Sequence, residues 1–286
     1  MRPVLFTLFG YPFHSYAMLL SAAAIGCTLL AVREGEKRGL WLPPEGGIWV
    51  FLGALFGAKI YYIIQFDPKW YLNLWKAVLV WQGGLVSYGG LLGGMAAAYL
   101  YTGFHKIPRL QTADTIAPYV ALAEAAARLG CFLNGCCFGA PTDLPWGLRF
   151  PKGSHAWTRQ LDLGLIPETA SSSLPVHPTQ LYMVLGLVLM ALALKVALDR
   201  KRFDGQVALL WMLLYGLWRF LVEMFRADSA RPLFGMTASQ TVSIGLVLFS
   251  LVLFVLAWQR GLWKAQGPTR PQASAESGAV QTSDRE

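Results

Sequence analysis

The chain has 286 residues, of which 55% are hydrophobic and 14% are charged, and it carries a formal net charge of +8. Soluble proteins hold about 25% charged residues, so this composition argues against a soluble protein with buried helices and predicts a membrane protein. The positive charge does not require a nucleic-acid partner, because cationic loops beside anionic lipid account for it.

Seven apolar segments follow one another, each near the length of about 20 residues that crosses a bilayer. They are 16–32, 48–66, 77–101, 116–133, 181–198, 207–225 and 238–258. We therefore expect an all-α, polytopic membrane protein with about seven transmembrane helices. The first segment has no basic leader and no clear cleavage site, which favours a retained span over a signal peptide.

Lysine and arginine residues concentrate in the loops on one side of these segments. Cytoplasmic loops carry such an excess, so the N-terminus is expected outside and the C-terminus in the cytoplasm. Segment 134–178 then lies outside, and its Trp146, Phe150 and Trp157 predict a small external cap on a membrane domain of residues 1–265. The polar tail 266–286 is expected to be disordered.

The fourth apolar segment contains two charged residues, Glu124 and Arg128, four positions apart. An arginine at the centre of a spanning helix costs about 2.5–3.5 kcal/mol even on lenient scales. Such a residue therefore needs a partner or a function. A structural ion pair between Glu124 and Arg128 is one interpretation, since residues four apart are neighbours on a helix.

The sixth apolar segment has a second charged series. Tyr215, Arg219, Glu223 and Arg226 are spaced by four, four and three residues, which places them on one helical face. Together with the fourth segment this gives three arginines against two glutamates, a surplus of one positive charge, and Lys59 can add another. Because the guanidinium fork grips two phosphate oxygens, the alternative to structural ion pairs is a site for a phosphodiester.

Motifs spread over most of the chain resemble those of the prolipoprotein diacylglyceryl transferase family. They are Arg128 to Gly139 (Arg-Leu-Gly-Cys-Phe-Leu-Asn-Gly-Cys-Cys-Phe-Gly, preceded by Ala127 where the family has glycine), His14-Ser15-Tyr16, Gly83-Gly84-Leu85, Gly89-Gly90, His177-Pro178-Thr179-Gln180-Leu181-Tyr182 and the series from Tyr215 to Arg226. The resemblance implies a multi-pass enzyme of the bacterial plasma membrane, with membrane lipid around it and no cofactor. It would transfer a diacylglyceryl group from phosphatidylglycerol to the lipobox cysteine of a secreted prolipoprotein.

The resemblance also implies roles for individual residues. Arg128 and Arg219 would hold the phosphate, and Glu223 and Arg226 would orient Arg219. Further residues expected to bind substrate or line the cavity are Tyr16, Asn134, Gly139, Tyr88, Gly89, Gly90 and Tyr215. The glycine pairs allow either a broken helix with exposed amides or tight helix packing through small residues.

The reaction needs a base, because a free thiol has a pKa near 8.5 and attacks as the thiolate. The candidates are His14, His177, Tyr88 and Glu223, and the sequence does not choose between them. Many family members have histidine where this chain has Tyr88. The catalytic residues expected from sequence are therefore Arg219, Tyr88, His14 and Glu223.

Three cysteines, Cys131, Cys136 and Cys137, lie near the end of the fourth segment. Their spacing lacks the second ligand pair of structural zinc sites, so no metal is expected. A disulfide is an alternative on the outer face, but packing as small apolar residues is favoured. In the resembled family Cys131 is often asparagine and Cys136 often glutamate, and Met183 stands where a glutamate is common.

The lost carboxylates and histidine keep two other interpretations open. One is a divergent paralogue that acts on another lipid or thiol. The other is a lipid or anion transporter that uses the same arginines without chemistry. The joint presence of Asn134, Gly139, Tyr215 and Arg219 favours the enzyme.

Overall fold

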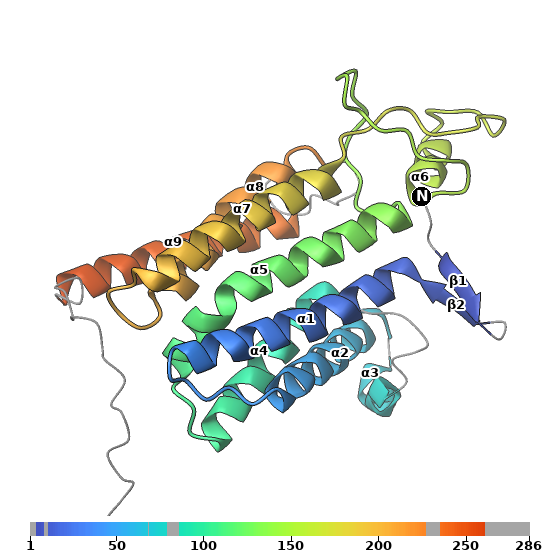
Figure 1. The fold of residues 1–286 in the computed structure, drawn as a ribbon. Helices are drawn as coiled ribbons and strands as arrows, with labels where there is room; N and C mark the ends of the chain where they lie inside the picture. The colour runs from blue at the N-terminus through green and yellow to red at the C-terminus, as the bar shows by residue number, and fades with distance from the viewer. Residues whose placement is uncertain (1–3, 9–10, 68, 79–85, 227–234, 261–286) are drawn as a thin grey trace, which may run out of the picture.

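The structure, a computed structural model, describes residues 4–8, 11–67, 69–78, 86–226 and 235–260 (Figure 1). The predicted disordered tail 266–286 and the Gly83-Gly84-Leu85 motif lie outside the described residues. The elements in chain order are β1 (Val4–Leu8), β2 (Tyr11–His14), α1 (Ser15–Lys37), α2 (Glu45–Phe66), α3 (Trp70–Asn73), a 3-10 turn (Leu74–Val78), α4 (Ser87–Phe104), α5 (Arg109–Asn134), α6 (His155–Asp162), α7 (Thr179–Asp199), α8 (Gln206–Glu223) and α9 (Ala238–Gln259).

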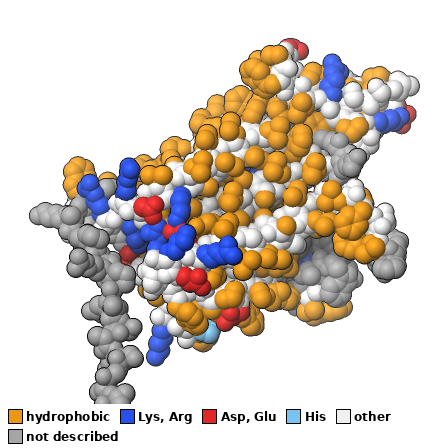
Figure 2. Space-filling model, viewed as in Figure 1, with side chains coloured by type: hydrophobic (Ala, Val, Ile, Leu, Met, Phe, Trp, Pro, Cys, Tyr) orange, Lys and Arg blue, Asp and Glu red, His pale blue; other side chains and the backbone are white. Residues whose placement is uncertain are grey.

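Six described helices are long and apolar enough to cross a membrane, namely α1, α2, α5, α7, α8 and α9. Hydrophobic side chains cover the helix surfaces, whereas lysine, arginine and acidic side chains gather toward the ends of the molecule (Figure 2). An apolar exterior of this kind suits contact with lipid rather than water. The expected all-α, polytopic membrane fold is confirmed.

The third predicted segment differs from expectation. It was expected to start at residue 77, but residues 74–78 form the 3-10 turn and α4 starts at Ser87. α4 is rich in glycine and tyrosine and is not among the six candidate spans. α4 lies against α2 instead, and their glycines allow close contact: a Cβ on Gly89 would lie 2.3 Å from the carbonyl oxygen of Gly57.

α5 occupies the middle of the bundle, with α1 on one side and α7 and α8 on the other (Figure 1). Small residues of α5, including Ala121 and Ala125, are buried against large side chains of α7 such as Leu187 and Leu194. This packing draws the three helices together, because small side chains allow backbones to approach closely. Charged groups on α5 and α8 are thereby brought within reach of each other.

Segment 134–178 folds over one end of the bundle, which we call the cap end. Its core consists of Phe138, Phe150, Ala156 and Val176, and the indole of Trp157 donates a hydrogen bond to the carbonyl oxygen of Ala170 at 2.9 Å. α6 is the helix of this cap (Figure 1). The β1–β2 hairpin precedes α1 at the same end and was not predicted from the sequence.

Candidate active site

Three arginines line one small cavity at the cap end of the bundle. Arg128 comes from α5, Arg219 from α8, and Arg226 from the segment just after α8; the other lining residues are Cys137, Thr179, Gln180, Met183 and Val222. The cavity measures about 10 Å³, roughly the space of a single water molecule. A lipid headgroup therefore enters only after these side chains move apart.

Arg128 is held by the carboxylate predicted from its spacing. Its Nη2 donates to Glu124 Oε1 at 2.9 Å, and Tyr215 Oη of α8 donates to the same oxygen at 3.0 Å. The Nε of Arg128 is buried and has no hydrogen-bond partner among the described residues. A buried donor without a partner is costly, so this N–H group is available to a ligand oxygen.

Glu223 is fully buried between the other two arginines. Its Oε2 lies 2.8 Å from Arg219 Nη1 and 3.6 Å from Arg226 Nη1, and Arg219 Nη2 donates to Ser239 Oγ at 3.0 Å. The predicted helical face therefore holds for Tyr215, Arg219 and Glu223, whereas Arg226 lies beyond the end of α8, where its backbone forms a bridge with Gly139. With Glu124 and Arg128, the group has three positive charges and two negative ones, a surplus of one.

Gly139 lies where three stretches of backbone meet. Its N–H donates to the His177 carbonyl at 2.9 Å, and a Cβ there would lie 2.7 Å from the Phe225 carbonyl oxygen. The next residue, Ala140, donates to that same oxygen at 2.7 Å. Gly139 thus fixes the chain beside Arg226, with which it forms a bridge; its direct contact with substrate stays a prediction.

Tyr16 and Asn134 lie near the arginines at the cap end. Tyr16, in the first turn of α1, packs on Gly130 of α5, where a Cβ would lie 2.9 Å from Tyr16 Cδ2. Asn134 is the last residue of α5. Gly130 is a position that the sequence did not single out, although it belongs to the Arg128 to Gly139 motif.

Of the candidate bases, Glu223 contacts two of the arginines that line the cavity, and neither His14 nor His177 is a lining residue. His14 is an exposed residue at the end of β2, and His177 Nδ1 lies 3.2 Å from Tyr182 Oη. Tyr88 is in the first turn of α4, but its side chain lies outside the described residues. Among the residues that line the arginine cavity there is no histidine.

Three further residues predicted from the sequence, Gly89, Gly90 and Lys59, lie on the packed helices α4 and α2. Gly89 packs on Gly57, and the nearest atom to a Cβ on Gly90 would be the Ala54 carbonyl oxygen at 3.4 Å. This contact supports the packing alternative for the glycine pair, and a substrate role stays a prediction. Lys59 lies on α2 with its ammonium 5.5 Å from the Tyr62 ring and is not among the residues lining the cavity.

Sequence reasoning gave no role to Thr179 and Gln180, which begin α7 and are both buried. Thr179 Oγ1 donates to the Cys137 carbonyl at 2.7 Å, and Gln180 Nε2 donates to the Cys136 carbonyl at 2.7 Å. These bonds fix the loop after α5 onto α7. The signal was present in the His177 to Tyr182 motif, whose polar residues at a helix start need partners.

The cysteines lie in the wall of the same site. Cys137 lines the arginine cavity, and hydrogen bonds from the thiols of Cys131 and Cys136 lower its pKa. The charges of Arg226 and Arg128 act in the same direction, while burial opposes them. We expected the three cysteines to serve as small apolar packing residues, but charged and hydrogen-bonding groups act on Cys137.

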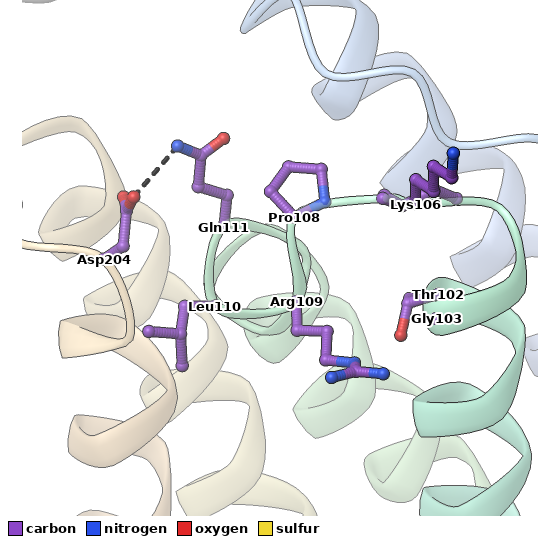
Figure 3. A pocket seen from close by; sticks show the side chains of 9 residues that line it. Thr102, Gly103, Lys106, Pro108, Arg109, Leu110, Gln111 and Asp204 are labelled. Atoms are coloured by element: carbon purple, nitrogen blue, oxygen red, sulfur yellow. Dashed lines mark hydrogen bonds between the residues drawn. The ribbon is translucent and has the colours of Figure 1, made fainter.

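A larger pocket of about 510 Å³ lies at the other end of α5 (Figure 3). Polar and charged residues line much of it, and Gln111 Nε2 donates there to Asp204 Oδ2 at 2.9 Å. Arg109, which also lines it, stacks its guanidinium 3.8 Å from the Tyr99 ring. This pocket is separate from the arginine cavity and contains none of the predicted site residues.

Comparison with known proteins assigns the chain to a family. The sequence profile described as prolipoprotein diacylglyceryl transferase matches residues 3–256. Among similar proteins, phosphatidylglycerol–prolipoprotein diacylglyceryl transferases of Clostridium tetani and Ruegeria pomeroyi are 30% and 33% identical, and the matches cover 89% and 88% of this chain and 97% and 93% of theirs. The transferase of Proteus mirabilis is 31% identical over 93% of this chain and 95% of its own length. The chain therefore belongs to the prolipoprotein diacylglyceryl transferase family.

Proposed function

We propose that this protein transfers the diacylglyceryl group of phosphatidylglycerol to the lipobox cysteine of a prolipoprotein. The observation that carries the proposal is the meeting of Arg128, Arg219 and Arg226 at one buried cavity with a surplus positive charge. A buried surplus charge is costly unless an anion neutralises it. A lipid phosphodiester supplies that anion.

The geometry divides the arginines by task. Arg128 and Arg219 come from different helices, so their guanidinium groups approach a phosphate from two sides, and the free Nε–H of Arg128 adds a donor. Glu124 and Tyr215 orient Arg128, while Glu223 orients Arg219 and Arg226. Donors fixed in this way stabilise negative charge as it develops, without reorganisation at the moment of reaction.

In the reaction the cysteine sulfur attacks the glyceryl carbon that bears the phosphate. A sulfur–carbon bond forms, the carbon–oxygen bond breaks, and glycerol phosphate leaves with the bonding electron pair. The thiol proton passes to solvent, and the leaving phosphate becomes a dianion between Arg128 and Arg219. The arginines thus stabilise the negative charge that develops on the leaving phosphate, and they do not activate the thiol nucleophile.

The cap end belongs on the outer side of the bacterial plasma membrane. Lys195, Lys201 and Arg202 lie at the opposite end of the bundle, at or beyond the last turns of α7, and such residues favour the cytoplasm. A secreted precursor then meets the site on the side to which it has been exported. The N-terminus lies outside and the C-terminus inside.

The test uses the purified chain in phosphatidylglycerol-containing detergent micelles with a lipobox peptide. We expect glycerol phosphate to be released together with a peptide whose mass has increased by one diacylglyceryl group. A peptide with serine in place of the cysteine gives neither product. Binding of lipid without its consumption would identify a transporter, and release only with a different thiol acceptor would identify a divergent paralogue.

A further inference from the structure

The sulfur atoms of Cys131, Cys136 and Cys137 form a compact group beside the arginine cavity. All three lie within 4.8 Å of one another, with Cys131 buried and the other two half-buried. Thiolates of a tetrahedral zinc site, with bonds of about 2.3 Å, lie roughly 3.8 Å apart. Small side-chain rotations therefore bring the three sulfurs to zinc-binding distances.

The backbone produces this group through the way α5 ends. Gly135 has a left-handed φ of 74°, the N–H of Cys136 donates to the Cys131 carbonyl at 3.1 Å, and the N–H of Gly135 donates to the Phe132 carbonyl at 3.2 Å. This pair of bonds is the Schellman motif, in which the residue after the turn packs back on the last helical turn. Cys136 is therefore placed over Cys131, although five residues separate them in sequence.

The loop that carries the other two cysteines is held rigidly. Cys137 has a φ of 61°, which non-glycine residues rarely adopt. The side chains of Thr179 and Gln180 hold the carbonyl groups of Cys137 and Cys136. A strained residue fixed by buried hydrogen bonds is typical of functional sites, and packing alone does not require it.

We propose that Cys131, Cys136 and Cys137 bind one thiophilic divalent cation, zinc, and that its fourth coordination position receives the cysteine thiol of the incoming precursor. The substrate part of this inference rests on the proposed function. Catalytic zinc sites keep three protein ligands and one open position. Bound zinc would hold the substrate sulfur as thiolate, since metal-bound thiols are deprotonated.

A metal ion at the three cysteines would supply a means of deprotonating the substrate thiol, which the described side chains lack. No histidine lines the cavity, and Glu223 is fully buried and paired with Arg219 and Arg226, so the described residues offer no base that is free to take the thiol proton. The proton passes to solvent when the thiol binds the cation, and the sulfur then attacks the glyceryl carbon as described above. Cys137 and Arg219 line the same cavity, which places nucleophile and leaving phosphate side by side.

The charges are also compatible. Three thiolates and one divalent cation together carry one negative charge, and the arginine group carries one positive charge in surplus. The opposite charges of the two groups therefore attract each other, while the buried Nε–H of Arg128 stays available to the lipid phosphate. This explains how three thiolates and three arginines can share one membrane-embedded region, where an isolated charge is costly.

The first experiment measures metal binding without activity. Protein purified under reducing conditions is loaded with Zn²⁺ and analysed for metal per chain; we expect one ion. Losing one ligand, as in Cys136→Ser, should weaken binding at least about tenfold, since even outer-shell changes cost that much. Cys27→Ser, which changes the cysteine of α1, is the matched control and should bind normally. Equal binding by Cys131→Ser/Cys136→Ser/Cys137→Ser, or a disulfide among these cysteines, overturns the proposal.

A second experiment tests the open position on the unmutated chain. Co²⁺ replaces Zn²⁺, and sulfur-to-cobalt charge-transfer absorption is recorded while lipobox peptide is added. The band should grow with the cysteine peptide and stay unchanged with its serine analogue. An identical spectrum with both peptides overturns the assignment of the fourth ligand, and it does so even if the cysteine variants fold poorly.

Transfer assays separate this inference from the proposed function. If metal-free wild type transfers lipid at the full rate, the zinc proposal fails and the transferase proposal stands. If the zinc-loaded protein binds peptide thiol but releases no glycerol phosphate from phosphatidylglycerol, the transferase proposal fails and the metal site stands. Loss of transfer on chelation, restored by Zn²⁺, supports both.

Discussion

The two ends of α5 hold buried charges in opposite ways. At the end away from the cap, Asp114 is fully buried and each of its oxygens accepts two hydrogen bonds. The donors are the backbone N–H groups of Gly205, Val207 and Ala208 and the ammonium of Lys201, at 2.8–3.0 Å. Asp114 therefore caps the N-terminus of α8, where free N–H groups and the helix dipole favour an anion.

At the cap end, the buried charged groups are not fully hydrogen-bonded. Arg128 keeps a buried N–H without a partner among the described residues, and neither oxygen of Glu223 accepts a well-oriented hydrogen bond there, in spite of its close ion pair with Arg219. A saturated buried charge is a structural device, whereas an unsaturated one has capacity left for a ligand. The comparison assigns stability to one end and binding to the other.

The largest expected effect is on catalysis at the cap end. Arg128→Ala and Arg219→Ala should each abolish detectable transfer, a loss of at least about 10²–10³ in rate for a removed transition-state donor. Both proteins should remain folded and inserted. Glycerol phosphate release measures the loss, with Arg159→Ala on the cap helix α6 as an exposed control. Full turnover by Arg219→Ala would contradict the phosphate assignment.

The next effect is on stability at the other end. Asp114→Ala should lower the free energy of unfolding by about 3–5 kcal/mol, as for other broken buried pairs, because it leaves three backbone N–H groups unpaired and removes one of the two carboxylate partners of Lys201. Turnover per folded molecule should not change. Denaturant unfolding in detergent measures the first quantity. Should Asp114→Ala unfold normally but lose turnover, the proposed division between the two ends would be wrong.

A charge-conserving change makes the comparison finer. Arg219→Lys keeps the positive charge but loses the two-pronged grip on phosphate and carboxylate. We expect transfer to fall by about tenfold, equivalent to about 1.4 kcal/mol, through kcat/KM. If lysine restored the full rate, charge alone would suffice and the fork geometry would be irrelevant.

The smallest effect concerns pH at the end away from the cap. Burial acts to raise the pKa of Asp204, but hydrogen bonds from Lys201 and Gln111 outweigh it and hold the pKa below its usual value. Burial likewise acts to lower the pKa of Lys201, but its bonds to Asp204 and Asp114 raise it overall. The stabilisation from Asp204 is thus present above the usual carboxyl pKa and is lost as pH falls through the lowered one. The stabilisation from Lys201 is lost as the pH rises through its raised pKa.

Asp204→Asn tests this dependence through unfolding temperature against pH. The difference between wild type and variant should be constant near neutral pH and vanish in acid below the lowered pKa. It should remain modest, because Asp204 is partly exposed and solvent screens it. A difference that grows as the pH falls would contradict the sign of the shift.

Hydropathy predicted most of the fold because a bilayer requires long apolar helices. Six expected spans match helices, and the pair Glu124–Arg128 follows from spacing within a helix. Glu223 and Arg226 also pair, although Arg226 lies beyond the last residue of α8. The expected start of the third segment, at residue 77, was wrong, because this glycine-rich segment gives no clear boundary.

Contacts between elements were harder to predict. Periodicity within α5 and α8 says nothing of how the two helices are placed, so a shared site of Arg128 and Arg219 was expected only from the surplus of positive charge and from family resemblance. The three cysteines were noticed, but a metal site was not expected, because their spacing along the chain lacks the second ligand pair of known zinc motifs. The Asn134-Gly135 pair, which ends α5, was the available signal that the chain turns back on itself.

The length of α5 has a consequence for how lipid reaches the enzyme. Its 26 residues extend about 39 Å at 1.5 Å per residue, whereas the hydrocarbon layer is about 30 Å thick. Arg128, six residues before the end, then sits about 9 Å below the helix tip and a few ångströms under the headgroup boundary. A phospholipid can drift in from the surrounding leaflet with its tails still in oil, so no step of extraction into water is needed.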